Sequence, residues 1–372
     1  MIRTLLILVT AAVCLAPAAI ASSEETGTEA SEVDTVALAE LSAEELFLRS
    51  SSAALQFAPM IQPSRRVLVR EYDRSLPYLI TQLDTDGPRE RHALEDILVR
   101  IGEPAVEPLI DALGEELERT DTLRGARMAA GILGRLDDER ATPALCAAAR
   151  HADWKVRSSV ASALGRVGSA DGVDGLVRLL ADRNEIVRKS AAVAIRRMAT
   201  EPEPPKDPTT APHGDTEQSA DPEDAAEEYE RLLARHDRSI AARNAVMDDV
   251  VVRALVRALG DNYYHVRYSA ASALTGIGSD ALPLLIGVAN VGRGPERLMA
   301  LSAIGSIGDD SALGPLNELL EDESWTVRAF AAEAIGKIVP DRRARKALSK
   351  LLASEDHPFV SMRAGDALAP ME

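Results

Sequence analysis

Aromatic residues and cysteines are scarce in this chain of 372 residues. Phe, Trp and Tyr make up only 3% of the sequence, and the two cysteines are Cys14 and Cys146. If the N-terminal segment that contains Cys14 is removed on export, one thiol remains, and it cannot form an internal disulfide. No later apolar run reaches the roughly 18 residues of a membrane helix. The sequence therefore excludes a disulfide-stapled scaffold, predicts no membrane span and leaves packing to hold the fold together.

The first 21 residues have the pattern of a secretory signal. Arg3 supplies a positive charge, Thr4–Leu15 is an apolar core, and an Ala-Ile-Ala sequence ending at Ala21 suits cleavage. A lipid anchor at Cys14 is disfavoured because Ala11–Val13 fits a lipoprotein signal poorly. We therefore expect export to the periplasm or the medium. Arginine outnumbers lysine, which favours a bacterial source.

The net charge of −17 is concentrated in two segments. Residues 22–48 carry eight acidic and no basic side chains, and residues 201–230 carry eleven acidic side chains and one lysine. The remainder of the chain is therefore nearly neutral. Because nucleic-acid binding requires a basic surface on the folded part, this distribution argues against a nucleic-acid partner.

One sequence pattern recurs along the chain. Four segments carry it most clearly: WKVRSSVASALGRVG (154–168), EIVRKSAAVAIRRMA (185–199), YHVRYSAASALTGIG (264–278) and WTVRAFAAEAIGKIV (325–339). Arg157 and Arg188 are 31 residues apart. A second motif follows each copy, such as ADGVDGLVRLL (170–180) or DSALGPLNELL (310–320). A period of this length with two motifs predicts a stack of similar structural units.

Both motifs have helical spacing. Val160, Ala161 and Leu164 lie three, four and seven residues after Arg157, which places them on one helix face. We expect N-caps at Asp153, Asn184 and Ser324, and left-handed glycines that end helices at Gly168, Gly278 and Gly308. The chain is therefore predicted to be all-α: an α-solenoid, or superhelix, of about seven to eight helical hairpins, with the second helices lining the concave face.

The pattern D-x-x-V-R-x-x-A-A-x-A-L-G-x-I-G, followed by A-x-x-P-L-x-x-L-L, resembles the short HEAT-like repeat that also occurs in phycobilisome lyases. The resemblance covers roughly residues 64–200 and 247–370. Together with the signal pattern and the composition, it gives the following division: 1–21 signal peptide, 22–41 acidic disordered linker, 42–200 N-terminal repeats, 201–224 disordered Pro- and acid-rich insertion, and 225–372 C-terminal repeats with a preceding helix.

An arginine recurs at one position of the repeat. The copies are Arg91, Arg157, Arg188, Arg267, Arg297 and Arg328. Each shares a face with buried alanines, so it requires an acid or free carbonyls from the adjacent repeat. Asp182, Asp261 and Asp322, each six residues before an arginine, are the candidate partners. The resemblance implies that this arginine staples neighbouring repeats; the alternative is a row of ligand-binding side chains.

Three aromatic residues occupy one repeat position, three residues before the arginine: Trp154, Tyr264 and Trp325. Both tryptophans of the chain are among them. One interpretation is that each ring covers the end of the preceding helix. The other is that the three are anchors for a partner, since aromatic side chains dominate protein interfaces.

The sequence contains no recognisable catalytic, cofactor or metal site. No histidine is followed by glutamate, as in the di-iron hydroxylase built on HEAT-like repeats, and no two histidines have zinc-site spacing. The aspartate pairs 137–138, 248–249 and 309–310 are interpreted as helix caps. The expected function is an exported HEAT-repeat scaffold that binds a protein or peptide through its concave face or loop edge, without catalysis. The alternative is a ligand-binding or enzymatic protein of the bilin-lyase type.

Overall fold

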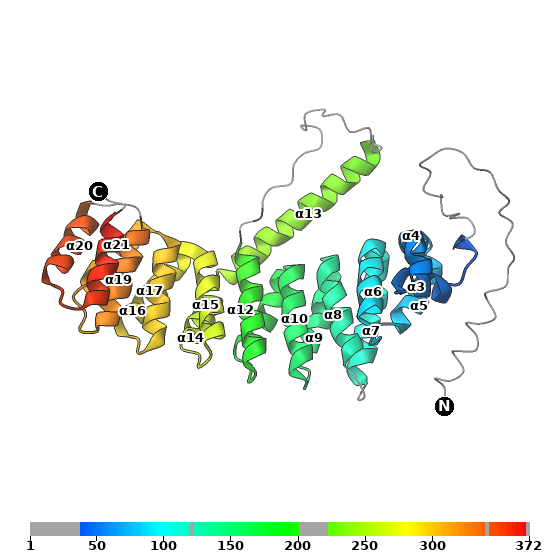
Figure 1. The fold of residues 1–372 in the computed structure, drawn as a ribbon, viewed down its shortest axis with the longest axis horizontal. Helices are drawn as coiled ribbons and strands as arrows, with labels where there is room; N and C mark the ends of the chain where they lie inside the picture. Colours follow the sequence, from blue (N-terminus) through cyan, green and yellow to red (C-terminus); the bar gives the residue numbers. More distant parts are fainter. Residues whose placement is uncertain (1–37, 120–122, 201, 203–221, 339–341, 370–372) are drawn as a thin grey trace.

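The computed structural model describes residues 38–119, 123–200, 202, 222–338 and 342–369. These residues form helices and turns and contain no strand. The helices stack side by side into a curved rod, with the N-terminal and C-terminal helices at opposite ends (Figure 1). The predicted α-solenoid is confirmed. The predicted signal peptide, most of the acidic linker and most of the 201–224 insertion lie outside the described residues.

Each repeat is a hairpin of a first helix, which carries the arginine motif, and an antiparallel second helix. The first helices are α4 (Ile61–Arg70), α6 (Pro88–Ile101), α8 (Arg124–Leu136), α10 (Trp154–Val167), α12 (Glu185–Ala199), α15 (Tyr264–Ile277), α17 (Pro295–Ile307), α19 (Trp325–Lys337) and the unpaired α21 (Pro358–Leu368). The second helices are α5 (Tyr72–Thr81), α7 (Val106–Glu118), α9 (Thr142–Ala148), α11 (Val173–Leu180), α14 (Asp249–Ala258), α16 (Leu282–Val291), α18 (Leu313–Leu319) and α20 (Arg342–Ser354). Helix α3 (Ala43–Ser51) packs beside α4 at the N-terminal end.

The helix ends follow the local sequence, with two differences from expectation. Asp153 and Asn184 cap α10 and α12 by accepting hydrogen bonds from backbone N–H groups of the first turn. Ser324 stands at the N-cap of α19 but makes no such bond, because its hydroxyl pairs with Thr326 Oγ1 at 2.7 Å. Gly278 ends α15 with φ 83° and ψ −141°, outside the left-handed helical region that was expected. Gly168 and Gly308 do adopt that region.

The first helices pack against each other very closely. A Cβ added to Gly165 of α10 would lie 2.5 Å from the Cβ of Ala194 on α12, so only glycine allows this approach. The same contact recurs between Gly134 and Ala163, Gly305 and Ala334, and Gly336 and Ala367. Alanines on these helices, among them Ala161 and Ala191, are fully buried in a continuous apolar core along the rod.

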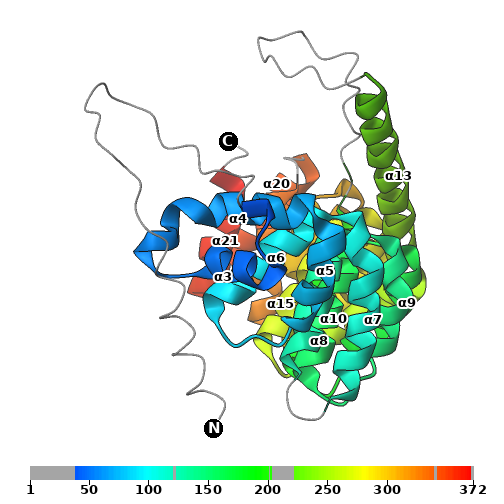
Figure 2. The same cartoon turned by 90° about the vertical axis from the view of Figure 1, so that its right-hand side faces the viewer.

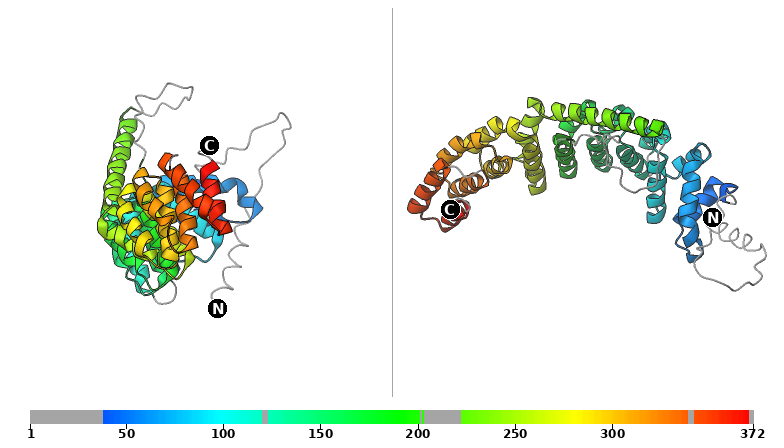
Figure 3. Two further views of the ribbon diagram at one scale, coloured as in Figure 1. Left: turned by 90° about the vertical axis from the view of Figure 1, so that its left-hand side faces the viewer. Right: turned by 90° about the horizontal axis from the view of Figure 1, so that it is seen from above.

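Neighbouring second helices are further apart than neighbouring first helices and leave open grooves between them. One groove, of about 860 Å³, lies between α18 and α20, and another, of about 690 Å³, lies between α11 and α14. A stack with two unequal spacings bends toward its more closely packed row. The first helices therefore line the concave side of the arc seen in Figure 3. The expectation that the second helices line it was wrong.

Helix α13 (Pro222–Val246) lies outside the regular stack, between the two helices of the repeat formed by α12 and α14. It begins at Pro222, inside the segment that was predicted to be a disordered insertion through residue 224. Viewed from the N-terminal end of the rod, it extends along one side of the stack and beyond it (Figure 2). Arg238 Nη2 pairs with Asp137 Oδ1 at 3.0 Å, and Ala242 and Val246 are buried. This helix is therefore docked on the edge where first helices turn into second helices.

Residues Tyr264–Val291 are apolar and long enough to cross a membrane by composition alone, with a mean hydropathy of 1.4. In the fold they are two antiparallel helices, α15 and α16, that turn at Gly278. Each of these helices is much shorter than the roughly 20 residues that a span requires. Their apolar character reflects the contacts between repeats in the stack.

Candidate functional site

Arg157 connects two repeats through a nearly enclosed ion pair. Its Nε and Nη2 donate to the two carboxylate oxygens of Asp182 at 2.6 and 2.8 Å. The side chains are only 7% and 9% exposed. Nη1 turns the other way and donates to the backbone carbonyls of His151 and Ala152 at 2.7 Å. All three nitrogens are thus satisfied, which allows a buried guanidinium to be tolerated.

Similar ion pairs recur along one edge of the rod and form the arginine ladder, although Arg297 binds its acid through Nη2 and uses Nε for the carbonyl of Ala289. Each acid lies six residues before the arginine-position residue of the following repeat. The further rungs are Arg188 with Asp261 at 2.6 Å, Arg297 with Asp322 at 2.6 Å and Arg328 with Glu355 at 2.7 Å. The backbone carbonyl of Asp182 also accepts a hydrogen bond from Arg188 at 2.8 Å. Each such aspartate therefore binds the arginine before it with its side chain and the arginine after it with its backbone.

The ladder lowers the pKa of its acids. Burial alone would raise the pKa of Asp182, but the hydrogen bonds and charge of Arg157 outweigh it and bring the pKa below its usual range. The hydrogen bond that Arg157 donates to Asp182 correspondingly raises the pKa of Arg157. The pKa is also lowered at the other three acids, Asp261, Asp322 and Glu355. These acids stay ionised in the folded protein.

The ladder is interrupted at Arg267 of α15. The position that supplies the acid in other rungs is occupied by Val291, whose side chain is 83% exposed. Arg267 Nη1 keeps its bonds to the carbonyls of Asp261 and Asn262 at 2.7 and 3.1 Å. Its Nε is buried without a hydrogen-bond partner. Within the described residues, no carboxylate contacts this guanidinium. We call this place the open rung.

The chain departs from the ladder at its two ends as well. Arg91 of α6 donates to the carbonyl of Asp86 at 2.7 Å. In α21, Ser361 stands at the arginine position and donates to the carbonyl of Glu355 at 3.3 Å. A hydroxyl thus stands here in place of the guanidinium, and it keeps the bond to the carbonyl six residues before it.

Exposed apolar side chains gather on the concave face beside the open rung. Tyr264 and Tyr268, one turn apart on α15, are 54% and 60% exposed, with ring centroids 6.1 Å apart. Ile186 and Val193, two turns apart on the adjacent α12, are also exposed. Helical spacing places these four residues on the sides of α12 and α15 that face away from the second helices. We call this set the concave patch.

The structure separates the three aromatics of the predicted row. Tyr264 belongs to the concave patch, and the guanidinium of Arg267 lies 5.8 Å from its ring centroid. Trp325 is 42% exposed and stacks on His357 of the next repeat with centroids 4.1 Å apart. Trp154 is half-buried and packs against the core. The ring of Trp325 thus lies against the N-cap residue of α21, the next first helix.

Tyr268, Ile186 and Val193 were missed by the sequence analysis. A signal was present, because Tyr268 lies one helical turn after Tyr264 and Ile186 stands two residues before a ladder arginine. Four exposed basic residues lie on the same faces of α10 and α12: Lys155, Arg166, Lys189 and Arg196. In the part of the chain that the structure describes, none of them forms a salt bridge. The concave face is therefore locally basic although the whole chain is acidic.

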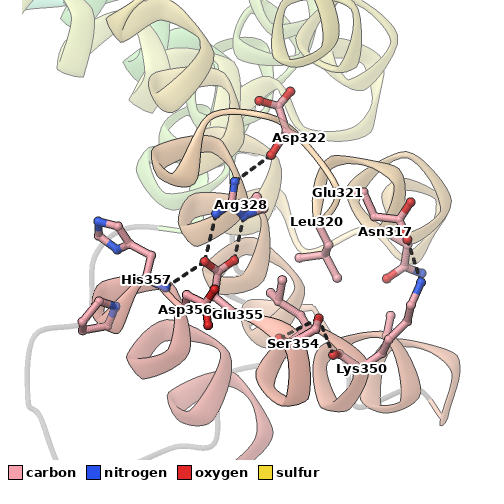
Figure 4. Close-up of a pocket in the computed structure, with 13 residues that line it drawn as sticks. Asn317, Leu320, Glu321, Asp322, Arg328, Lys350, Ser354, Glu355, Asp356 and His357 are labelled. Atoms are coloured by element: carbon pink, nitrogen blue, oxygen red, sulfur yellow. Dashed lines mark hydrogen bonds and ion pairs between the residues drawn. The ribbon is translucent and has the colours of Figure 1, made fainter.

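The groove between α18 and α20 is a further concavity that is large enough for a ligand (Figure 4). The charged side chains that cross it engage each other: Lys350 pairs with Glu321 at 2.8 Å, and Arg328 pairs with Glu355. The hydroxyl of Ser354 donates to a backbone carbonyl and not to a base. The groove thus lacks the paired nucleophile and base of covalent catalysis. Among the described residues, no three His, Cys, Asp or Glu side chains lie close enough to hold a metal ion.

Comparison with known families agrees with this geometry. A model described as HEAT repeats matches residues 110–196 and 292–369, and one described as PBS lyase HEAT-like repeat matches residues 266–290. The chain belongs to the HEAT-like repeat family. The HEAT repeats matched in this way include the ladder arginines Arg157, Arg188, Arg297 and Arg328, and the shorter match contains Arg267.

Solved structures share the HEAT-repeat fold. Two crystal structures of importin beta, from an ammonium sulfate and a polyethylene glycol condition, are each 15% identical to the chain, with TM-scores of 0.52 and 0.53. Each match covers 88% of this chain. This chain spans only 45% and 46% of the length of the two importin beta chains. The match to human deoxyhypusine hydroxylase has 21% identity and covers 82% of this chain and 97% of the hydroxylase. Its TM-score of 0.31 is too low to support a conclusion about this chain. No curated protein matches the chain.

Proposed function

We propose that this HEAT-repeat chain is an exported scaffold that binds a protein or peptide partner along its concave face and has no catalytic activity of its own. The concave patch carries the proposal. In a chain with 3% aromatic residues, two tyrosines that are more than half exposed stand side by side on the inner row of helices. Tyrosine supplies a large contact area at low entropic cost and is enriched in binding hot spots.

The repeat architecture supports the same proposal. A solenoid presents an extended surface whose shape is set by buried residues, so exposed positions can vary without loss of the fold. The residues of the concave patch are not needed to bury the core, which is formed by other faces of α12 and α15.

Affinity capture from periplasm or culture medium tests the binding role. The double variant Tyr264→Ser/Tyr268→Ser should lose the partner that the unchanged chain retains, with little change in melting temperature. Leu352→Ser is the matched control, because Leu352 is 41% exposed on the second helix α20. If the double variant retains every partner that the unchanged chain captures, the concave patch is not the binding surface.

Export is tested separately. The chain expressed with its first 21 residues in a bacterium should appear in the periplasm or medium, with a mature N-terminus at Ser22. A cytoplasmic product that retains Met1 would contradict this part of the proposal.

A further inference from the structure

We propose that the open rung at Arg267 is the binding site for an acidic side chain of the partner: an Asp or Glu in an extended peptide whose neighbouring residues lie on Tyr264 and Tyr268. This inference rests on the proposed function, because it names the chemistry of the partner that the concave face binds. The carboxylate of the partner would complete the arginine ladder at the place where the chain itself supplies none.

The other rungs show what Arg267 lacks. Arg157, Arg188 and Arg328 each use Nε to bind a carboxylate from the next repeat at 2.6 to 2.7 Å. Arg267 makes the same carbonyl contacts through Nη1 as they do, so its side chain is held in the same orientation. Its Nε nevertheless has no partner. An unpaired buried donor on a cation is costly, and a carboxylate with fork geometry satisfies it best.

The surroundings of the open rung suit a peptide. Val291, which stands at the sequence position of the rung acid, carries no charge and is 83% exposed. Tyr264 lies against the guanidinium and Tyr263, 49% exposed, precedes it. An extended strand could therefore place its acid at Arg267 and its flanking apolar groups on the tyrosines. Backbone and pocket contacts of this kind are the usual means of peptide recognition.

Charge complementarity favours an acidic partner over a neutral one. Lys155, Lys189, Arg166 and Arg196 are exposed on the neighbouring first helices, and among the described residues none has an acidic partner. They would attract a negatively charged strand and make its association dependent on salt. The acids of the ladder itself are all engaged in ion pairs, so they do not oppose it.

A random peptide library selected on the full chain tests the inference. The enriched peptides should share an Asp or Glu at one position. When a peptide is resynthesised with Asn or Gln at that position, its dissociation constant, measured by fluorescence anisotropy, should rise about tenfold or more. Val291→Asp places a carboxylate within the chain at the sequence position that the rung acids occupy, six residues before Arg297. It should abolish the preference for the acid and raise the melting temperature. Val291→Asn, of the same shape without charge, should retain the preference.

The outcomes separate the two proposals. Two results would overturn the inference and leave the scaffold proposal standing. In the first, the selected peptides depend on Tyr264 and Tyr268 but have no preference for an acidic residue. In the second, that preference persists in the Val291→Asp variant. Selection of no peptide that depends on the tyrosines would overturn both. If a synthetic peptide of residues 22–37 or 203–221 displaces the selected peptides from the unchanged chain but not from Tyr264→Ser/Tyr268→Ser, the occupant is the chain itself, and the assignment to a partner fails.

Discussion

Asp182 accepts two hydrogen bonds from Arg157 with its carboxylate and one from Arg188 with its backbone carbonyl. Two consecutive first helices, α10 and α12, are thereby joined through one residue in the turn between α11 and α12. Because the Arg157–Asp182 pair is almost fully enclosed, its integrity should matter more than that of any surface ion pair.

Asp182→Ala should lower the free energy of unfolding by about 3 kcal/mol, because it leaves the guanidinium of Arg157 buried and unpaired. Urea titration followed by circular dichroism measures this. Glu321→Ala, which breaks the Lys350–Glu321 pair with side chains 74% and 72% exposed, is the control and should leave the midpoint almost unchanged. Equal effects of the two substitutions would show that the ladder does not stabilise the stack.

Gly165→Ala should destabilise the protein by roughly 1–3 kcal/mol, because the new Cβ would overlap Ala194 on the next first helix. Gly131→Ala is the matched control: Gly131 also lies within a first helix, and a Cβ there meets no atom within 4 Å. It should stabilise by roughly 0.5–1 kcal/mol through helix propensity. Thermal unfolding of both variants checks the prediction, and an unchanged Gly165→Ala would mean that the first helices are not in such close contact.

The stability of the stack should fall in acid. The folded pKa of Asp182 lies below its unfolded value of about 3.9, so its contribution is fully present above pH of about 4 and is lost as the pH falls through the folded pKa. The difference in unfolding free energy between the unchanged chain and Asp182→Asn should therefore shrink below pH of about 4. The deficit of Leu164→Ala, about 2–5 kcal/mol from a buried cavity, should not change with pH in this way.

The docking of α13 should depend on Asp137. This residue accepts from Arg238 and also pairs with Arg235, and its left-handed backbone, with φ 57°, is one that asparagine tolerates. Asp137→Asn should therefore speed amide hydrogen exchange in α13 while the first helices keep their protection. Asp309→Asn, at the corresponding turn of a later repeat, is the control. Unchanged exchange in α13 would show that its apolar contacts alone hold it.

Trp325 distinguishes an interface anchor from a structural ring. Because it is 42% exposed but stacks on His357, Trp325→Ala should reduce the melting temperature far less than Leu164→Ala does. A loss equal to that of Leu164→Ala would assign the ring to packing between α19 and α21 only.

The sequence was sufficient to predict the repeating units because every copy satisfies the same local rules. The six-residue offset from acid to arginine identified Asp182, Asp261 and Asp322, and the same offset applied once more leads to Glu355 and to the exception at Val291. The concave side could not be predicted in the same way, since helical periodicity shows which face is buried but not which row is more closely spaced. The glycine that faces an alanine one repeat later, as in Gly165 and Ala194, was the signal that could have decided it.

The double role of each rung acid has a consequence for the length of the rod. A deletion or duplication that begins and ends at the same point of the repeat, such as the 31 residues from Arg157 to Arg188, preserves both the side-chain and the carbonyl contact at the new junction. A deletion or duplication of any other length leaves one guanidinium or one carboxylate at the junction without its ion-pair partner. The chain could thus gain or lose whole modules over evolutionary time, and protein engineers could lengthen or shorten it by the same unit.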